Sequence, residues 1–293
     1  FQALTANTTG IENVSIGRKV LDANTEGSNN TAIGNSSLTT NTTGGSNVAV
    51  GKDALSQNTT GACNTAIGLN ALYENTTAGS NTAVGYKALE VNTTGTENTA
   101  VGQNALVKNT TADNNTAMGN SALACNTTGA SNTTFGRVAL LKATTGSGNT
   151  SIGSGALNSV TTGSQNVGIG FNAGAQGAMI DIITENNRAV FGHTDITHAY
   201  VKVAFTVTSD QRDKTNFGTV PHGLDFVNQL NPVSFQFKKS REDDTPHGDV
   251  RYGFKAQDIM ALEGDNPVII DNEQPEHLKY KGEHLVPVLV NAI

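Results

Sequence analysis

The first 170 residues place their apolar positions at fixed points of a 17-residue repeat that runs without an insertion. A glycine recurs in each repeat, with an asparagine four residues before it and, in nine of the ten repeats, a leucine four residues after it. The residue immediately before each glycine is large and apolar, from Ile16 to Ile169. The ten repeat glycines are Gly17, Gly34, Gly51, Gly68, Gly85, Gly102, Gly119, Gly136, Gly153 and Gly170.

A repeat of this length is too short for a pair of helices and is typical of one coil of a parallel β-solenoid. Each unit has two short extended pieces, typified by residues 31–33 and 54–55, and glycines and Asn-Thr pairs favour turns between them. We expect the stacked coils to bury an Ile/Val ladder and a leucine ladder. We also expect the asparagine columns to hydrogen-bond along the stack.

The alanines two residues before the glycines, such as Ala32 and Ala117, alternate with the Ile/Val ladder. Successive side chains of a strand point to opposite faces, so we expect these alanines on the outside. A column of small residues there would favour close packing against another chain. The repeat therefore predicts a homotrimer, and an intertwined three-chain solenoid would fit the same pattern.

The unit, idealised as N-T-A-I-G-x-x-A-L, is similar to the head repeats of YadA-like trimeric adhesins and to repeats in phage tail fibres. The resemblance covers residues 1–170 and implies an elongated surface-display shaft, with a host cell-surface receptor or glycan as its partner. The threonine columns, which include Thr8, Thr25 and Thr42, also resemble the arrays of ice-binding solenoids. The Asn-x-Thr sequences match glycosylation acceptors, but turn chemistry explains both patterns more simply.

The repeat fails after Gly170, and residues 171–208 predict a β-rich connector. Apolar runs at residues 179–183, 189–192 and 199–208 read as its strands. His193 and His198 lie five residues apart, a poor spacing for a metal on a strand, so we expect surface or turn histidines and no metal site.

Residues 209–293 change to a mixed α+β pattern with ordinary charge. The pattern predicts a helix at 223–230 that is stopped by Asn231 and Pro232. The further predicted elements are a strand at 233–237, a loop at 240–248, a helix at 255–262, a strand at 268–270 and a final helix at 284–293.

Charge and composition exclude several classes of protein. Residues 1–170 hold eight acids and seven bases, and the rest hold seventeen and eleven, so the net charges are −1 and −6 out of a total of −7. Neither part is a basic nucleic-acid surface, and no apolar run approaches the roughly 18 residues of a membrane span. Cys63 and Cys125 fall at different phases of the repeat, so no disulfide framework is expected, and nothing indicates a cofactor.

At the junction between the connector and the α+β module, Ser209 and Lys214 lie five residues apart. A hydroxyl beside an amine that can lose its proton is a minimal nucleophile–base pair. A lysine serves as a base only where burial or a nearby cation favours its neutral form, and Arg212 or a trimer interface could provide this. The negative charges of Asp210 and Asp213 oppose the neutral form of Lys214, unless these side chains point away from it. The spacing alone favours the alternative in which the serine caps a turn and the lysine pairs with a surface acid.

The module at 209–293 resembles the intramolecular chaperone of endosialidases and other phage tailspikes and fibres, a family of self-cleaving serine peptidases. The family continues into a long coiled-coil helix where this sequence stops at Ile293. The matching segments are Ser209-Asp210-x-Arg212-x-Lys214, then Gly223-Leu224 to Asn231-Pro232, then Tyr252-Gly253-Phe254-x-Ala256-Gln257, then Leu285-Val286-Pro287 to Ala292-Ile293.

The resemblance implies that Ser209 is the nucleophile, Lys214 its partner and Arg212 a supporting residue, with the cut between Ser209 and Asp210. Attack by the serine hydroxyl on its own carbonyl would form a strained four-membered ring. Either another chain's groups or water attack that bond, or the hydroxyl attacks the preceding carbonyl and cuts between Thr208 and Ser209.

The sequence therefore predicts a mainly β protein: a homotrimeric parallel β-solenoid of ten 17-residue repeats at 1–170, a connector at 171–208, and a small α+β chaperone and autopeptidase domain at 209–293. The predicted function is that of a phage tail fibre or tailspike protein, assembled in the host cytoplasm and located in the virion. Its chaperone would drive trimerisation of the shaft and release itself by autoproteolysis next to Ser209. The alternative is a structural adhesin shaft that does not cleave and binds host surface glycans.

Overall fold

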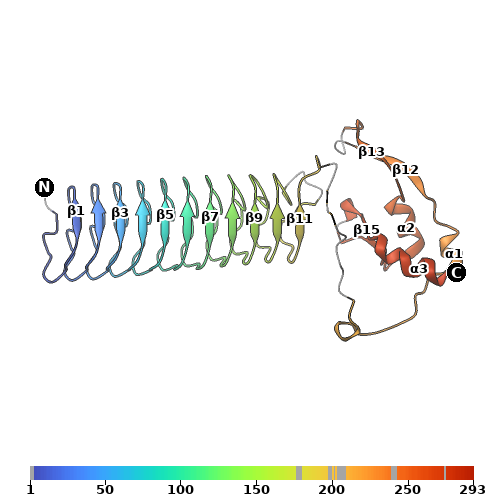
Figure 1. The fold of residues 1–293 in the computed structure, drawn as a ribbon, viewed down its shortest axis with the longest axis horizontal. Helices are drawn as coiled ribbons and strands as arrows, with labels where there is room; N and C mark the ends of the chain where they lie inside the picture. Colours follow the sequence, from blue (N-terminus) through green and yellow to red (C-terminus); the bar gives the residue numbers. More distant parts are fainter. Residues whose placement is uncertain are drawn as a thin grey trace. The chain divides into compact units, whose positions relative to one another are not determined.

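The computed structural model of the chain describes residues 3–175, 180–196, 200, 202, 209–238, 243–273 and 275–293. The chain divides into two compact units, residues 1–193 and residues 194–293. The first unit is a stack of similar coils, and the second combines short helices with small sheets (Figure 1).

Eleven three-residue strands form one parallel sheet along the first unit, in the order of the chain. Ten of them recur every 17 residues, so that Thr82 pairs with Thr99 and Val84 with Val101. This register confirms the predicted parallel solenoid. The strands are β1 Val14–Ile16, β2 Thr31–Ile33, β3 Val48–Val50, β4 Thr65–Ile67, β5 Thr82–Val84, β6 Thr99–Val101, β7 Thr116–Met118, β8 Thr133–Phe135, β9 Thr150–Ile152, β10 Val167–Ile169 and β11 Ala189–Phe191.

The sheet extends beyond the tenth repeat into the segment predicted as a connector. Strand β11 pairs in parallel with β10, with Val167 opposite Ala189. The strand predicted at 179–183 is absent from its described part, residues 180–183, and Ile182 is instead fully buried in the solenoid core. The strand predicted at 199–208 lies almost wholly outside the described residues.

Along the strands, the residues that face the solenoid core are the opposite set from those predicted. The alanine at the centre of most strands, such as Ala66, is fully buried, whereas its neighbours Thr65 and Ile67 face outward. Successive side chains of a strand point to opposite faces, so the burial of the middle residue places its two neighbours on the outer face. The lumen also receives a leucine from nine of the ten coils, and a small residue on the strand leaves room for it. The prediction that the Ile/Val ladder is buried and the alanines lie outside was therefore wrong.

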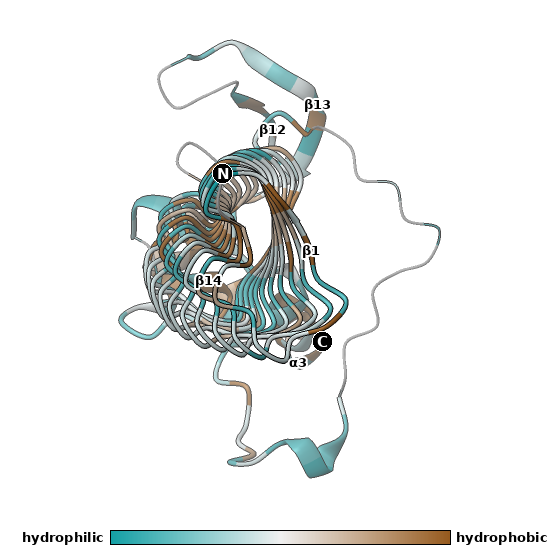
Figure 2. Cartoon of the chain, turned by 90° about the vertical axis from the view of Figure 1, so that its left-hand side faces the viewer, coloured by the Kyte–Doolittle hydropathy of each residue, from teal (hydrophilic) through white to brown (hydrophobic). Residues whose placement is uncertain are grey.

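The second predicted ladder, the leucines, is confirmed as core. Leu21, Leu72 and Leu157 typify a column of nine leucines that are fully buried. Each leucine has a positive φ near +50°, as in Leu72 at 52°, a conformation that a bulky residue rarely adopts. Seen down the stack, apolar residues gather in one band along the strands and another along the facing wall (Figure 2).

A repeat glycine follows each of the strands β1 to β10, at a position where a side chain does not fit. Gly85 has φ of +136°, and an added Cβ would lie 2.7 Å from the carbonyl oxygen of Gly102 in the next coil. That distance is well inside van der Waals contact, and the backbone conformation itself is open mainly to glycine. The close approach of neighbouring coils therefore requires a glycine at this position of each repeat.

Two columns of asparagines, fully buried from the second coil onward, tie the coils together. In the first column, the Asn64 Oδ1 accepts the backbone N–H of Asn81 at 3.0 Å, and its Nδ2 donates to the carbonyl of Ala78 at 2.9 Å. In the second, the Asn75 Nδ2 donates to Oδ1 of Asn58 at 2.8 Å. The predicted hydrogen bonding along the stack is thus confirmed, and it satisfies amides that burial would otherwise leave without partners.

The threonines that follow the second asparagine column also bond within the stack. The Thr76 hydroxyl donates to the carbonyl of Thr93 at 3.1 Å, and the same contact recurs between Thr42 and Thr59. These hydroxyls complete the turns between coils, which agrees with the simpler interpretation of the threonine columns.

The second unit has a small core between short helices and strands. Its buried apolar side chains include Phe226, Ile259, Ile270, Leu285 and Val288. The helices predicted at 223–230 and 284–293 are present in shortened form, and the one predicted at 255–262 is present one residue later. Strand β13 begins inside the predicted loop. The elements are η1 Gln211–Asp213, α1 Leu224–Val227, β12 Val233–Lys238, β13 Pro246–Gly253, α2 Ala256–Glu263, β14 Ile270–Asp271, η2 Pro275–His277, β15 Lys279–Tyr280, η3 Gly282–His284 and α3 Leu285–Asn291.

Candidate functional site

The predicted nucleophile and its partner lie in contact. Lys214 Nζ donates to Ser209 Oγ at 2.5 Å. The contact forms because the chain between the two residues folds into the single 3-10 turn η1, Gln211–Asp213, where the Lys214 N–H returns to the Gln211 carbonyl at 3.1 Å. A nucleophile and a base within hydrogen-bond reach form the minimal geometry for activating a hydroxyl.

The predicted supporting residue, Arg212, makes its described hydrogen bonds with Asp210 rather than with Lys214. Its Nε lies 3.0 Å and its Nη2 2.5 Å from the two oxygens of that carboxylate. The guanidinium holds the pKa of Asp210 below its usual value, and the carboxylate in turn raises the pKa of Arg212. The acid next to the serine is therefore directed at Arg212.

The junction loop is exposed in the single chain. All residues from Ser209 to Pro221 are classed as exposed, and none of η1 is buried. A neutral lysine amine is favoured by burial, which a second surface would have to supply. Geometry brings the serine and the lysine together, but the isolated chain does not enclose them.

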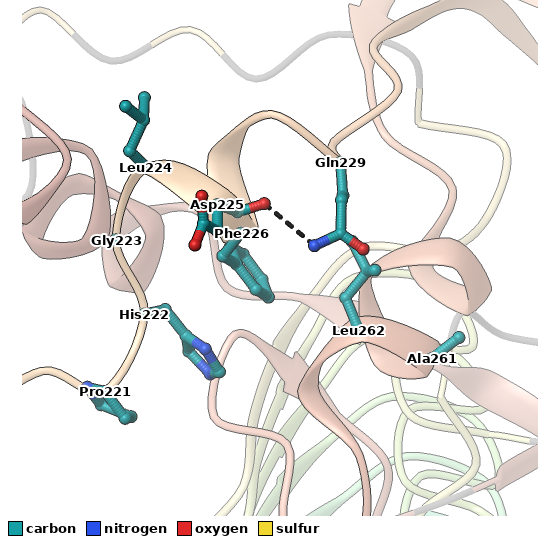
Figure 3. Close-up of a pocket in the computed structure, with 9 residues that line it drawn as sticks. All are labelled: Pro221, His222, Gly223, Leu224, Asp225, Phe226, Gln229, Ala261 and Leu262. Atoms are coloured by element: carbon teal, nitrogen blue, oxygen red, sulfur yellow. Dashed lines mark hydrogen bonds between the residues drawn. The ribbon is translucent and has the colours of Figure 1, made fainter.

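A hollow of about 550 Å³ lies downstream of the junction. The ring of His222 stacks on Phe226 with centroids 4.3 Å apart, and Gln229 Nε2 donates to the Asp225 carbonyl at 2.9 Å (Figure 3). The wall opposite is formed by Ala261 and Leu262 of α2. The hollow contains no serine, cysteine or lysine that could act as a nucleophile, so we assign it no part in cleavage.

Two side chains that the sequence reading missed hold this unit in shape. The Glu263 carboxylate accepts three successive backbone N–H groups, those of residues 268, 269 and 270, at 2.8, 2.8 and 3.0 Å. Asn291 Nδ2 on α3 donates to the carbonyl of His222 at 2.9 Å, 69 residues away in the sequence. Neither contact has a local sequence signal, because each depends on where the chain returns.

A second candidate site runs along the outside of the sheet. The residues immediately before the repeat glycines, here called the outer apolar ladder, point away from the core and are half-buried or exposed. Side chains such as Ile67 and Phe135 each remain 40% exposed, although they stand in a continuous apolar row. The ladder comprises Ile16, Ile33, Val50, Ile67, Val84, Val101, Met118, Phe135, Ile152 and Ile169.

Other chemistry is not indicated in the described part of the chain. Among those residues, no group of three His, Cys, Asp or Glu side chains could hold a metal ion. None of the helices there combines the length and the apolar character that crossing a bilayer demands. Cys63 and Cys125 are both free thiols, and His198 lies outside the described residues.

Comparison with known families bears on the second unit. The model of the family Peptidase_S74, described as chaperone of endosialidase, matches residues 209–268. No curated protein and no solved structure matches the chain. The match begins at Ser209, so the region with the serine–lysine contact is similar to a family of chaperones classed among the peptidases.

Proposed function

We propose that this chain is a phage tail-fibre or tailspike-type protein whose second unit acts as an intramolecular chaperone for the solenoid shaft and then cuts itself free next to Ser209. The observation that carries the proposal is the contact of 2.5 Å between Lys214 Nζ and Ser209 Oγ at the start of the chaperone match. A virion tail location follows from the same similarity.

The chemistry is an autoproteolysis that consumes one water molecule. In the route that uses the serine as nucleophile, Lys214 in its neutral form takes the proton of the Ser209 hydroxyl as the oxygen attacks the preceding carbonyl carbon. The C–N bond of that peptide then breaks, and the protonated amine returns the proton to the leaving nitrogen. Water hydrolyses the resulting ester, which restores the hydroxyl and leaves a free carboxyl end.

Two bonds fit a cut next to Ser209. The hydroxyl reaches the preceding carbonyl through a five-membered ring, which cuts between Thr208 and Ser209. The resemblance to self-cleaving chaperones favours the bond between Ser209 and Asp210, where water or groups of another copy attack instead of the serine's own oxygen. The two routes leave fragments that differ by one serine residue.

We further propose that three copies assemble through the outer apolar ladder. A parallel copy has the same rise per coil, so its ladder meets this one side chain by side chain along all ten repeats. Burial of apolar side chains such as Ile67 and Phe135 would drive that association. The single chain leaves Lys214 exposed, so the proposal also requires a neighbouring copy to supply the burial that a neutral lysine needs.

A repetitive shaft gains from such a chaperone. Ten coils of near-identical sequence can align one repeat out of step and lose contacts only at the ends. Non-local parallel pairing is also slow to nucleate. A trimerising module at one end would start the shaft in phase, and its removal would leave a product held by a high barrier to unfolding.

The alternative is a shaft whose module folds but does not cut, and which binds host surface glycans. The full exposure of the junction loop in the single chain favours this alternative. The test is an intact-mass measurement on the wild-type chain beside Ser209→Ala and Lys214→Ala. Two wild-type fragments and one full-length mass in each variant support cleavage and identify the bond. One full-length mass in all three supports the alternative.

A further inference from the structure

The carboxylate of Asp210 makes more contacts than any other side chain of the junction loop. Its Oδ1 accepts the backbone N–H of Arg212 at 2.8 Å and the Nε–H of the same residue at 3.0 Å. Its Oδ2 accepts from Nε at 3.1 Å and from Nη2 at 2.5 Å. One acid therefore binds both the backbone and the guanidinium of the residue two positions further on.

The backbone contact makes Asp210 the N-cap of the turn η1, Gln211–Asp213. Its own carbonyl accepts the N–H of Asp213 at 3.2 Å, and the Lys214 N–H closes the turn onto Gln211 at 3.1 Å. Aspartate is among the residues that cap a helical turn best, because its short side chain reaches the free N–H groups of the first turn.

The turn decides whether the lysine can reach the serine. Five residues of extended chain span up to roughly 17 Å, which is longer than a lysine side chain. A 3-10 turn shortens the path to about 2 Å per residue over its length. The contact between Lys214 and Ser209 thus depends on the turn, and the turn depends on its cap.

We propose that Asp210 is a positioning residue for the cleavage, in that its carboxylate caps the turn that brings Lys214 onto Ser209. The inference rests on the proposed function. The cap is the essential contact, and the ion pair with Arg212 adds to it. An asparagine or a serine at position 210 would keep the cap, whereas an alanine would remove it.

The experiment follows the fraction of chain cleaved against time, by intact mass, in a pulse–chase of the full chain made by cell-free translation. Asp210→Ala slows cleavage about tenfold, as expected from loss of an N-cap. Asp210→Asn and Asp210→Ser cleave within about threefold of the wild-type rate, because both residues cap well.

Rescue by asparagine and serine distinguishes positioning from a general structural effect, since both lack the charge but keep the acceptor. An Asp210→Ala chain that cleaves at the wild-type rate overturns the inference. An Asp210→Asn chain that cleaves as slowly as Asp210→Ala also overturns the inference, because the effect would then come from the charge of the side chain. A wild-type chain that never cleaves contradicts the proposed function itself. Each variant is also made in a Ser209→Ala background to keep the chain uncut. Sedimentation of these double variants detects any loss of assembly.

Discussion

The buried asparagine column allows a stability prediction with an internal control. Asn75 Nδ2 donates to Asn58 Oδ1 at 2.8 Å and to the Ala78 carbonyl at 3.0 Å, and its Oδ1 accepts from Asn92 at 3.1 Å. In Asn75→Ala, a buried oxygen of Asn58 and a buried N–H of Asn92 lose their partners. The Ala78 carbonyl keeps the bond from Asn64. At about 1–3 kcal/mol for each orphaned group, the variant loses about 2–6 kcal/mol of stability.

The control is a substitution of Asn126, the last asparagine of the column that contains Asn75. Ala143 stands where the next asparagine would be, so Asn126 Oδ1 has no hydrogen-bond partner. Asn126→Ala orphans the oxygen of Asn109 but removes the orphan at 126, and the Gly129 carbonyl keeps its bond from Asn115. The number of unsatisfied groups does not change. We therefore expect Asn126→Ala to cost at least about 2 kcal/mol less than Asn75→Ala.

The assay is urea unfolding of both variants, followed by far-UV circular dichroism in a Ser209→Ala background so that every sample contains the same full chain. A repeat array can unfold in steps, so the slopes of the transitions are compared before the midpoints. Equal losses of stability in the two variants would refute the argument, because the two changes remove the same atoms and differ only in the partners left behind.

Three further predictions concern the shaft and the junction. Gly85→Ala loses at least about 2 kcal/mol of stability in the same urea assay, because an alanine must adopt φ near +136°. Ile67→Asp on the outer apolar ladder yields monomers in sedimentation velocity, whereas Thr60→Asp on an exposed turn leaves the assembly intact. Arg212 holds the pKa of Asp210 low, so the ion pair stabilises the loop at pH values above the ordinary pKa of aspartate and is lost only as the pH falls through the lowered value. A carboxyl NMR titration checks this, and Arg212→Ala should return the pKa of Asp210 toward its ordinary value.

The sequence predicted the solenoid because its repeat is strict, and a period of 17 residues admits few architectures. It failed on which face of the strand is buried. Large apolar residues such as Ile67 usually lie inside, but in this solenoid Ile67 is 40% exposed, whereas Ala66 and Leu72 are fully buried. The alternation of Ala66 with Ile67 was visible in the sequence. It places the two side chains on opposite faces of the strand but does not determine which face is buried.

In the second unit, spacing alone could not predict that Lys214 contacts Ser209, and the resemblance directed attention to the pair. The roles of Glu263 and Asn291 had no signal in the sequence, because one depends on how the chain turns just after α2 and the other on a partner 69 residues away. The sequence presents Asp210 as an acid that opposes a neutral lysine unless its side chain points away. Its hydrogen bonds to Arg212 give it a different part, which follows from the direction of one side chain.

The measurement that tests the central claim most directly is refolding of the shaft with and without its module. Purified cleaved shaft and uncleaved Ser209→Ala chain are unfolded in urea, diluted, and examined by sedimentation velocity. The account predicts that the uncleaved chain returns to its assembled state, while the cleaved shaft remains monomeric or aggregates. Equal recovery of assembled shaft in both samples would contradict it, because the second unit would then not be the chaperone of the first.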